Sequence, residues 1–412
     1  MIFPNLVAFD LTRILLIAIV GLTIAGVNNM NPNFATNCKK IDKHNPLHPL
    51  STEAKRAVAV IEGIITKDEG GRGMASLVVP GDLEEAAMIF ARLKQKCDGN
   101  SNKDENDIHH PHVLILSGFP CCVDKNPPTE TDGPPGALAI ARAAVLMGYK
   151  VTIVTDDCNE KVFSAACADK QSWATHMRGD VDQQAQIHMD LTLKCFPSEN
   201  KMSSDDYMDL YSLADDCDLV IACERAGPGK DGKCYTMRGI DMTSAGLIAP
   251  LHLIVDKIRD CTAASTPFLA IGDGGNELGM GKMLDAILSN PKISNANQIA
   301  AVGVADRLIA ASVSNWGAYA LVGAAACVQI SDISKLPSSS SRSRFMVATS
   351  QFLPSSAEEN DLLDRCVSVG CRDGVSGLME ATVDGMPLET SLTCLEAIRF
   401  EVEAVACNVT NI

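Results

Sequence analysis

Short apolar runs alternate with segments of helical periodicity along most of this 412-residue chain. Aliphatic runs bounded by polar or glycine-containing segments predict buried strands at 112–117, 150–155, 218–223, 267–271 and 298–303. Amphipathic segments predict helices at 52–66, 82–96 and 134–147, and a further helix near 308–326. Strand, helix and strand in this order indicate right-handed crossovers. We therefore expect an α/β fold, a mainly parallel sheet flanked by helices on both faces in three αβα layers.

The two ends of the chain show other patterns. From residue 358 we expect a small C-terminal α+β extension: helix, loop, a short strand pair around 383–385 and a final helix. A Ser-rich tract predicts a loop insertion around 336–345. The apolar run at 14–27 is short for a membrane span, and it leaves a cleaved leader, a short anchor or a misassigned start open. We accordingly separate an apolar leader or anchor at 1–40 from a domain at 41–412.

Polar residues follow each predicted strand. Asp156 comes after the second strand, Glu224 and Arg225 after the third, and Asp273 after the fourth. Ligands of open α/β sheets bind beyond the carboxyl ends of the strands. We therefore expect one acidic cleft with arginines at that edge of the sheet.

The segment 272–281 is the most glycine-rich stretch of the chain and lies between a predicted strand and a helix start. Glycines let the backbone approach a ligand closely. Asp273, Asn276 and Glu277 can hold a metal ion or a substrate amine, although a tight turn whose acids cap the helix is an alternative. The spacing matches neither nucleotide-binding fingerprint, so no nucleotide cofactor is expected.

A long loop from Gly118 to Asp132 is a second candidate, because long loops in compact domains are often functional. It opens with Gly118, Phe119 and Pro120 and contains Glu130, whereas Asp132 can simply cap the next helix. These loop residues are candidates for substrate binding.

Three arginines are candidate anchors for an anionic substrate. Arg225 can pair with a substrate carboxylate in bidentate fashion, or it can pair with an acid and fix its loop. Arg238 can supply a second cationic contact. Arg372 begins a glycine-rich turn at 372–377 that either closes over the cleft or is an ordinary turn. Asn315 lies early in a helix of small residues and is a further polar candidate.

Charge and cysteine content exclude some classes of protein. The formal net charge of −16 argues against a nucleic-acid partner, which requires a basic surface. It does not exclude an anionic small molecule. The 16 cysteines include no Cys-x-x-Cys pair, so the spacing of a zinc site is absent. Buried, reduced thiols that act as small hydrophobic side chains are expected.

Several of these segments together resemble one known family. They are Gly118-Phe-Pro120, Pro127–Gly136, Glu224-Arg-Ala-Gly227, Gly272–Lys282, Ser314-Asn-Trp-Gly317 and Arg372–Gly377. Together they are similar to the C-terminal domain of D-glutamate cyclase, in the same order and from about residue 50 to the end. The resemblance implies a carbon–oxygen lyase (hydro-lyase) that converts D-glutamate to 5-oxo-D-proline and water. Animal members are mitochondrial and carry an additional N-terminal domain.

The chemistry of this cyclisation suggests roles for the candidates. Asp273 and Glu277 are the first choice for a base or metal ligand, and Glu224 and Asp156 the second. Arg225 and Arg372 are candidate carboxylate clamps. A divalent Mg²⁺ or Mn²⁺ would be held by Asp273, Asn276 and Glu277. The other expected substrate-binding residues are Gly118, Phe119, Pro120, Glu130, Gly274, Gly275, Asn276 and Asn315.

The alternative function is a metal-dependent phosphohydrolase or phosphate-binding protein that uses the same acidic, glycine-rich cleft. Residue types alone do not separate it from the cyclase. D-glutamate is the expected small-molecule partner, and a homo-oligomer is left open. The resemblance implies a mitochondrial location, with a cytoplasmic protein or one anchored through residues 14–27 as alternatives.

Overall fold

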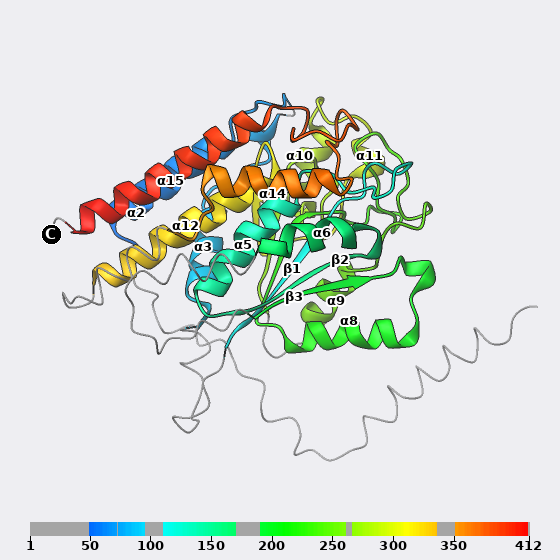
Figure 1. The fold of residues 1–412 in the computed structure, drawn as a ribbon, viewed down its shortest axis with the longest axis horizontal. Coiled ribbons are helices and arrows are strands. Elements are labelled where there is room, and N and C mark those ends of the chain that lie inside the picture. The colour runs from blue at the N-terminus through cyan, green and yellow to red at the C-terminus, as the bar shows by residue number, and fades with distance from the viewer. Residues whose placement is uncertain are drawn as a thin grey trace, which may run out of the picture. The chain divides into compact units, whose positions relative to one another are not determined.

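The computed structural model describes residues 49–71, 73–94, 110–169, 190–260, 266–335 and 351–410, all within one compact unit, Asn45–Ile412 (Figure 1). The apolar run at 14–27 and the Ser-rich insertion around 336–345 lie outside the described residues. Predictions about these two segments therefore stay predictions.

Six parallel strands form a single sheet in the order β3-β2-β1-β4-β5-β6. The strands predicted at 112–117, 150–155, 218–223 and 267–271 are all present. The observed bounds are β1 His112–Gly118, β2 Lys150–Asp156, β3 Leu191–Phe196, β4 Leu219–Arg225, β5 Phe268–Gly272 and β6 Arg307–Ala310. Strands β1, β4 and β5 are buried along their whole length, as is usual for parallel strands covered on both faces.

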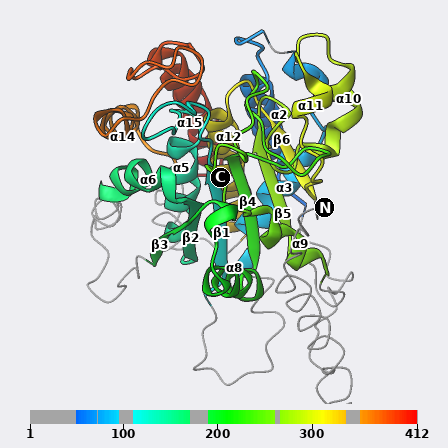
Figure 2. The same cartoon turned by 90° about the vertical axis from the view of Figure 1, so that its right-hand side faces the viewer.

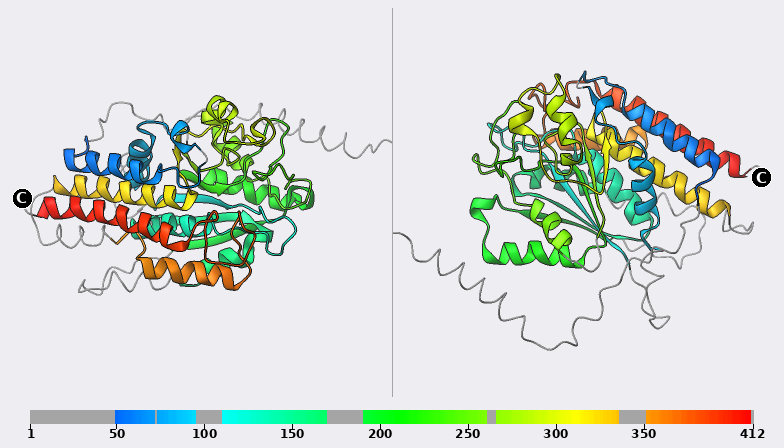
Figure 3. Two further views of the ribbon diagram at one scale, coloured as in Figure 1. Left: turned by 90° about the horizontal axis from the view of Figure 1, so that it is seen from above. Right: turned by 180° about the vertical axis from the view of Figure 1, so that it is seen from behind.

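Helices cover both faces of this sheet (Figure 2, Figure 3). Successive strand side chains point to opposite faces. Val113 and Ile115 pack in one apolar cluster with residues of α5 (Pro134–Leu146), α12 (Ser314–Ser334) and α15 (Leu388–Thr410). Leu114 and Leu116 pack in another with residues of α8 (Ser204–Asp216) and α9 (His252–Asp260). The prediction of an α/β fold with helices on both faces is therefore confirmed. The helices are α2 Thr52–Ile65, α3 Asp82–Ala91, α5 Pro134–Leu146, α6 Glu160–Ala166, α8 Ser204–Asp216, α9 His252–Asp260, α10 Leu284–Ser289, α11 Ala296–Ile299, α12 Ser314–Ser334, α14 Ser356–Ser368 and α15 Leu388–Thr410.

One predicted strand was wrong, and two strands of the sheet were not predicted. The apolar segment 298–303 is not a strand, because it begins at the end of α11 and then passes the glycine-rich loop, where the Ala301 N–H donates to the Gly275 carbonyl at 3.0 Å. The last strand is instead β6, inside the segment for which we predicted a helix. Strand β3 was missed because it lies at the edge of the sheet, where three of its six side chains are only partly buried and one is exposed.

The strand order places a topological switch between β1 and β4, where the crossovers reverse direction along the sheet. Ligands of doubly wound sheets bind in the crevice beyond the carboxyl ends of the strands at such a point. Gly118 ends β1 and Arg225 ends β4. The fold therefore directs attention to the loops that follow these two strands.

Helix α12 is the central helix of one layer and packs against α2, α3, α5 and α15. Figure 1 shows α2, α12 and α15 as three long neighbours. Among the described residues, α12 is the one helix long and apolar enough to cross a membrane, but 83% of its apolar window is buried inside the fold. This burial is typical of a core helix.

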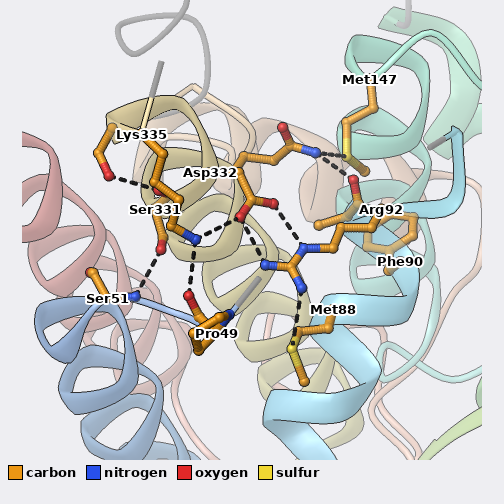
Figure 4. A network of polar contacts seen from close by, with 12 residues as sticks. Pro49, Ser51, Met88, Phe90, Arg92, Met147, Ser331, Asp332 and Lys335 are labelled. Carbon is orange, nitrogen blue, oxygen red and sulfur yellow. Dashed lines mark hydrogen bonds and ion pairs between the residues drawn. The ribbon is translucent and has the colours of Figure 1, made fainter. Parts of the chain in front are cut away.

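Polar contacts fasten the end of α12 to the helices around it (Figure 4). Arg92, directly after α3, donates from Nε and Nη2 to the two carboxylate oxygens of Asp332, both at 2.8 Å. The N–H of Ser51, the N-cap of α2, donates to Oγ of Ser331 at 2.8 Å. These contacts join segments that are more than 200 residues apart in the sequence.

A buried carboxyl on the same side of the sheet makes the stability of the fold depend on pH. Glu359 of α14 accepts a hydrogen bond from the Tyr319 hydroxyl of α12. Burial raises the pKa of Glu359 to about 7, against an ordinary value of 4.5. Because the folded pKa lies above the unfolded one, the stabilising contribution is complete below about pH 4.5 and is lost as the pH rises through about 7.

We expect Glu359→Gln to remove this loss. Between about pH 5 and about pH 8 the wild type should lose roughly 3 kcal/mol more unfolding free energy than the variant. Urea unfolding at several pH values measures the difference. Glu358→Gln is the control, because interactions with Ser355 and Arg142 lower the pKa of Glu358 to about 2 against the effect of burial. If the unfolding free energy of Glu359→Gln falls between about pH 5 and about pH 8 as much as that of the wild type, the prediction is wrong.

Candidate functional site

A cavity of about 110 Å³ lies beyond the carboxyl ends of β4 and β5. An engineered cavity of about 150 Å³ binds benzene, so a small molecule or part of one can enter a space of this order. Carboxylates dominate its wall. The charged lining residues are Glu130, Glu224, Asp273, Glu277, Asp384 and Arg238, and the others are Phe119, Cys121, Thr236, Met237, Ile240, Asn276, Gly374 and Val375.

The glycine-rich loop after β5 forms one wall of this cavity, and its own backbone holds Glu277 in place. The carboxylate of Glu277 accepts N–H donors from Gly274 and Gly275 at 2.7 Å each and from Asp273 at 3.3 Å. The amide Nδ2 of Asn276 donates to the Tyr235 carbonyl at 2.7 Å. The N–H groups of Gly274 and Gly275, which were predicted to bind substrate, thus donate to Glu277 instead. The loop places Asp273, Asn276 and Glu277 together in the cavity wall.

Glu224 also lines the cavity, and it does so in a strained backbone conformation. Its φ angle is 44°, in the left-handed region that non-glycine residues seldom adopt. The residue is only 5% exposed, and among the described residues its Oε2 atom has no hydrogen-bond partner. Strain of this kind is frequent at functional sites, where the surrounding structure holds the residue in place.

The surroundings of Glu224 favour its neutral form. Burial raises the pKa of this carboxyl well above 4.5, and the nearby carboxylates of Glu277, Asp132 and Glu130 raise it further. Burial likewise raises the pKa of Glu130, with help from Asp384 and Asp132. The cavity therefore contains two carboxyls, Glu130 and Glu224, whose surroundings favour the protonated form.

Two groups of three acids overlap in this cavity. Carboxylate oxygens of Glu224, Asp273 and Glu277 lie within 4.8 Å of one another, and so do those of Asp132, Asp273 and Asp384. Asp273 belongs to both groups. Clusters of carboxylate oxygens suit hard divalent cations such as Mg²⁺ and Mn²⁺.

Glu130 approaches the C-terminal turn at 372–377 closely. A Cβ atom on Gly374 would lie 1.9 Å from Oε2 of Glu130, so only glycine fits there. Asp373 accepts N–H donors from Val375 at 2.8 Å and Gly385 at 2.7 Å, which joins this turn to the Asp384 turn. The C-terminal region thus closes one side of the cavity.

Two predicted residues, Arg225 and Asp156, lie away from the cavity wall. Both are buried and form an ion pair with each other, in which Nη2 of Arg225 donates to Asp156 Oδ1 at 3.0 Å. Arg225 also donates to the Ala249 carbonyl at 2.8 Å, and Asp156 accepts the Ala249 N–H at 2.6 Å and an Asn159 Nδ2–H at 2.9 Å. Of the two alternatives for Arg225, the structure therefore shows the arginine–acid pair that fixes its loop.

Asn315 and Arg372 also make structural contacts. Oδ1 of Asn315 accepts the N–H groups of Gly133 at 2.9 Å and Gly136 at 2.8 Å, which anchors the start of α5. Nη1 of Arg372 donates to the Gly377 carbonyl at 3.3 Å within its own turn. Neither residue lines the cavity, and neither do Gly118 and Pro120, whereas Phe119 between them does.

Sequence reasoning underestimated Arg238 and overlooked Asp384. Among the described residues, Arg238 is the one cationic side chain in the cavity wall, and its Nη2 atom donates to the Val375 carbonyl at 2.7 Å. Asp384 follows Val383 in a two-residue turn and has a φ angle of 54°. The Asp-Gly pair at 384–385 is a recognisable turn signal, but no local pattern places this turn beside the glycine-rich loop.

Comparison with known proteins agrees with this picture. A family model described as "D-glutamate cyclase-like, C-terminal" matches residues 61–399. The chain is 29% identical over 362 residues to the human protein "D-glutamate cyclase, mitochondrial", and the match covers 84% of this chain and 52% of the human protein. The chain therefore spans about half the length of this curated relative. Since the family model covers most of the sequence, including every residue that lines the cavity, this chain belongs to the D-glutamate cyclase-like C-terminal domain family.

Proposed function

We propose that this protein is a D-glutamate cyclase, which removes water from D-glutamate to form 5-oxo-D-proline. The observation that carries the proposal is Glu224, a buried carboxyl with a raised pKa and an unpartnered oxygen, in a cavity that also holds Asp273. A buried carboxyl with a raised pKa is suited to donate a proton in acid–base catalysis. Family membership and the name of the human relative support the choice of substrate.

The reaction assigns complementary tasks to these acids. The amine nitrogen of D-glutamate forms a bond to the side-chain carboxyl carbon, and a carbon–oxygen bond breaks. The two protons that the nitrogen loses end on the departing oxygen as water. Glu224 in its protonated form would donate to the departing oxygen, and Asp273 would accept a proton from the amine. The cavity would hold the two ends of the substrate together, which supplies part of the rate.

The acid cluster also fits a divalent cation. Asp273 and Glu277 offer carboxylate oxygens within 4.8 Å of one another, which leaves Glu224 beside them to carry the proton. We infer that Mg²⁺ or Mn²⁺ would bind there, with the amide oxygen of Asn276 as a further candidate ligand. A bound cation would polarise the side-chain carboxylate of the substrate.

Arg238 is our candidate for the anchor of the substrate α-carboxylate. It is the one cation among the lining residues, and it replaces Arg225 in this role because Arg225 is occupied by Asp156. We expect Arg238→Gln to weaken binding by about 1.5–3 kcal/mol, the usual worth of a charged hydrogen bond. That corresponds to a roughly 10- to 150-fold higher KM for D-glutamate with little change in kcat. Steady-state kinetics measures it.

Arg372→Gln is the matched control for Arg238→Gln. Arg372 donates within its own turn and does not line the cavity, so its KM should stay close to that of the wild type. Equal KM values for wild type and Arg238→Gln would remove Arg238 as the anchor.

The decisive experiment incubates the purified protein with D- and L-glutamate, with and without Mg²⁺ or Mn²⁺, and detects 5-oxoproline by chiral separation. We expect 5-oxo-D-proline from D-glutamate only, and loss of activity after chelation that Mn²⁺ or Mg²⁺ restores. Formation of no product from either enantiomer under any metal condition would reject the cyclase. A phosphatase substrate run in parallel tests the alternative, metal-dependent phosphohydrolase function.

The proposed cellular location of this protein rests on the same human relative. The human relative is named as mitochondrial, and we propose a mitochondrial location for this chain too. Imaging of the full chain with a C-terminal tag would test this, with a chain that lacks residues 1–40 as the control.

A further inference from the structure

Two adjacent cysteines lie at the edge of the cavity and are not needed for the cyclisation. The Sγ atoms of Cys121 and Cys122 are 3.8 Å apart. Cys121 lines the cavity and its thiol contacts Oε2 of Glu130 at 3.3 Å. Cys122 is 8% exposed. The two sulfurs therefore form a dithiol in contact with a cavity carboxyl.

The two thiols differ in proton affinity. The hydrogen bond between the two sulfurs lowers the pKa of Cys122 to about 7, and the positive charges of Arg372 and Arg238 add to this effect against burial and Asp124. The same hydrogen bond, burial and Glu130 raise the pKa of Cys121. Cys223 differs from Cys122, because burial raises its pKa. A low-pKa thiol beside a resolving thiol is the arrangement of redox-sensitive cysteines.

We propose that Cys121 and Cys122 are a peroxide-reactive pair whose oxidation to a disulfide modifies the wall of the cavity. The Cys122 thiolate attacks one oxygen of hydrogen peroxide and becomes a sulfenic acid, and the hydroxide released takes a proton to give water. The Cys121 thiol then attacks the sulfur of the sulfenic acid, and a second water leaves. Two thiols and one peroxide thus give one disulfide and two waters.

Oxidation would change the cavity at Glu130. In the reduced protein the Cys121 thiol faces Oε2 of Glu130, and Gly374 packs against both groups. A bond to Cys122 draws the Cys121 sulfur toward its neighbour and removes its proton, so Glu130 loses this donor. The modification therefore acts on a carboxyl of the cavity rather than on a remote surface.

The test measures thiol chemistry directly. The reduced full-length protein is treated with hydrogen peroxide, its free thiols are alkylated, and its peptides are weighed. We expect the peptide that contains residues 121 and 122 to lose two hydrogens and to escape alkylation. Its free thiols should disappear at least roughly tenfold faster than the free thiol of Cys223, because thiolate content governs the rate of oxidation. Dithiothreitol should restore both thiols.

Variants separate the roles of the two sulfurs. In Cys121→Ser, the sulfenic acid on Cys122 should persist and be captured by dimedone, whereas Cys122→Ser should give no such product. Cys407→Ser is the control, because Cys407 is exposed and lies outside the cavity. The proposal is overturned if both thiols of wild-type protein stay alkylatable while Cys407 is oxidised. The wild-type measurement needs no variant to fold, and it does not depend on D-glutamate turnover.

Discussion

Replacement of Glu224 by Gln is expected to lower the rate of 5-oxoproline formation by about 100- to 10,000-fold, the usual contribution of a positioned acid or base. Gln keeps the shape of the side chain but has no proton to donate to the departing oxygen. The wild-type rate should fall on the alkaline side, since the protonated form of Glu224 is lost as the pH rises through its raised pKa. Rates of Glu224→Gln across the pH range should lack this decline.

Asp285→Asn is the matched control for Glu224→Gln. Asp285 lies in α10, directly after the glycine-rich loop, and its side chain is exposed. It should keep the wild-type rate and melting temperature. A Glu224→Gln protein that folds normally and turns over D-glutamate at the wild-type rate would eliminate Glu224 as the proton donor. A Glu224→Gln protein that fails to fold would assign the strained residue a structural role instead.

The second large effect concerns stability, not catalysis. We expect Arg225→Met to lower the free energy of unfolding by about 3–5 kcal/mol, because it leaves the buried Asp156 carboxyl without its charged partner. Arg225 also bonds to the carbonyl of Ala249, so the loop beyond β4 loses a second contact. Urea unfolding followed by circular dichroism measures the loss.

A double variant and a surface variant test whether the loss of stability in Arg225→Met comes from the unpaired Asp156. Arg225→Met with Asp156→Leu should recover part of the stability, since a buried apolar pair avoids the unpaired charge. Arg238→Met should change stability by less than about 0.5 kcal/mol, as expected for an exposed side chain. If Arg225→Met keeps wild-type stability and only raises KM, Arg225 contacts the substrate after all.

The strands of the sheet show which secondary-structure elements the local hydrophobic pattern can predict. The apolar runs of β1, β2, β4 and β5 were predicted from the sequence because a parallel strand buried on both faces has few polar positions. The same rule failed for β3, which lies at the sheet edge, and for 298–303, whose apolar residues lie at the end of α11 and beside the glycine-rich loop. An apolar run indicates only that its side chains are buried. Strands, short helices and segments packed beneath loops are all buried, so such a run does not by itself identify a strand.

The candidate site divides in the same way. The sequence by itself determined the glycine-rich loop at 272–281, the acids at the strand ends and the family, because each depends on residues that are adjacent or on motifs in a conserved order along the chain. It did not determine which arginine faces the cavity. Arg225 follows Glu224 directly, yet its guanidinium bonds to Asp156 and the Ala249 carbonyl, outside the cavity wall. Only the tertiary structure brought Arg238 and Asp384 to the cavity, because the packing of distant loops decides which side chains meet there.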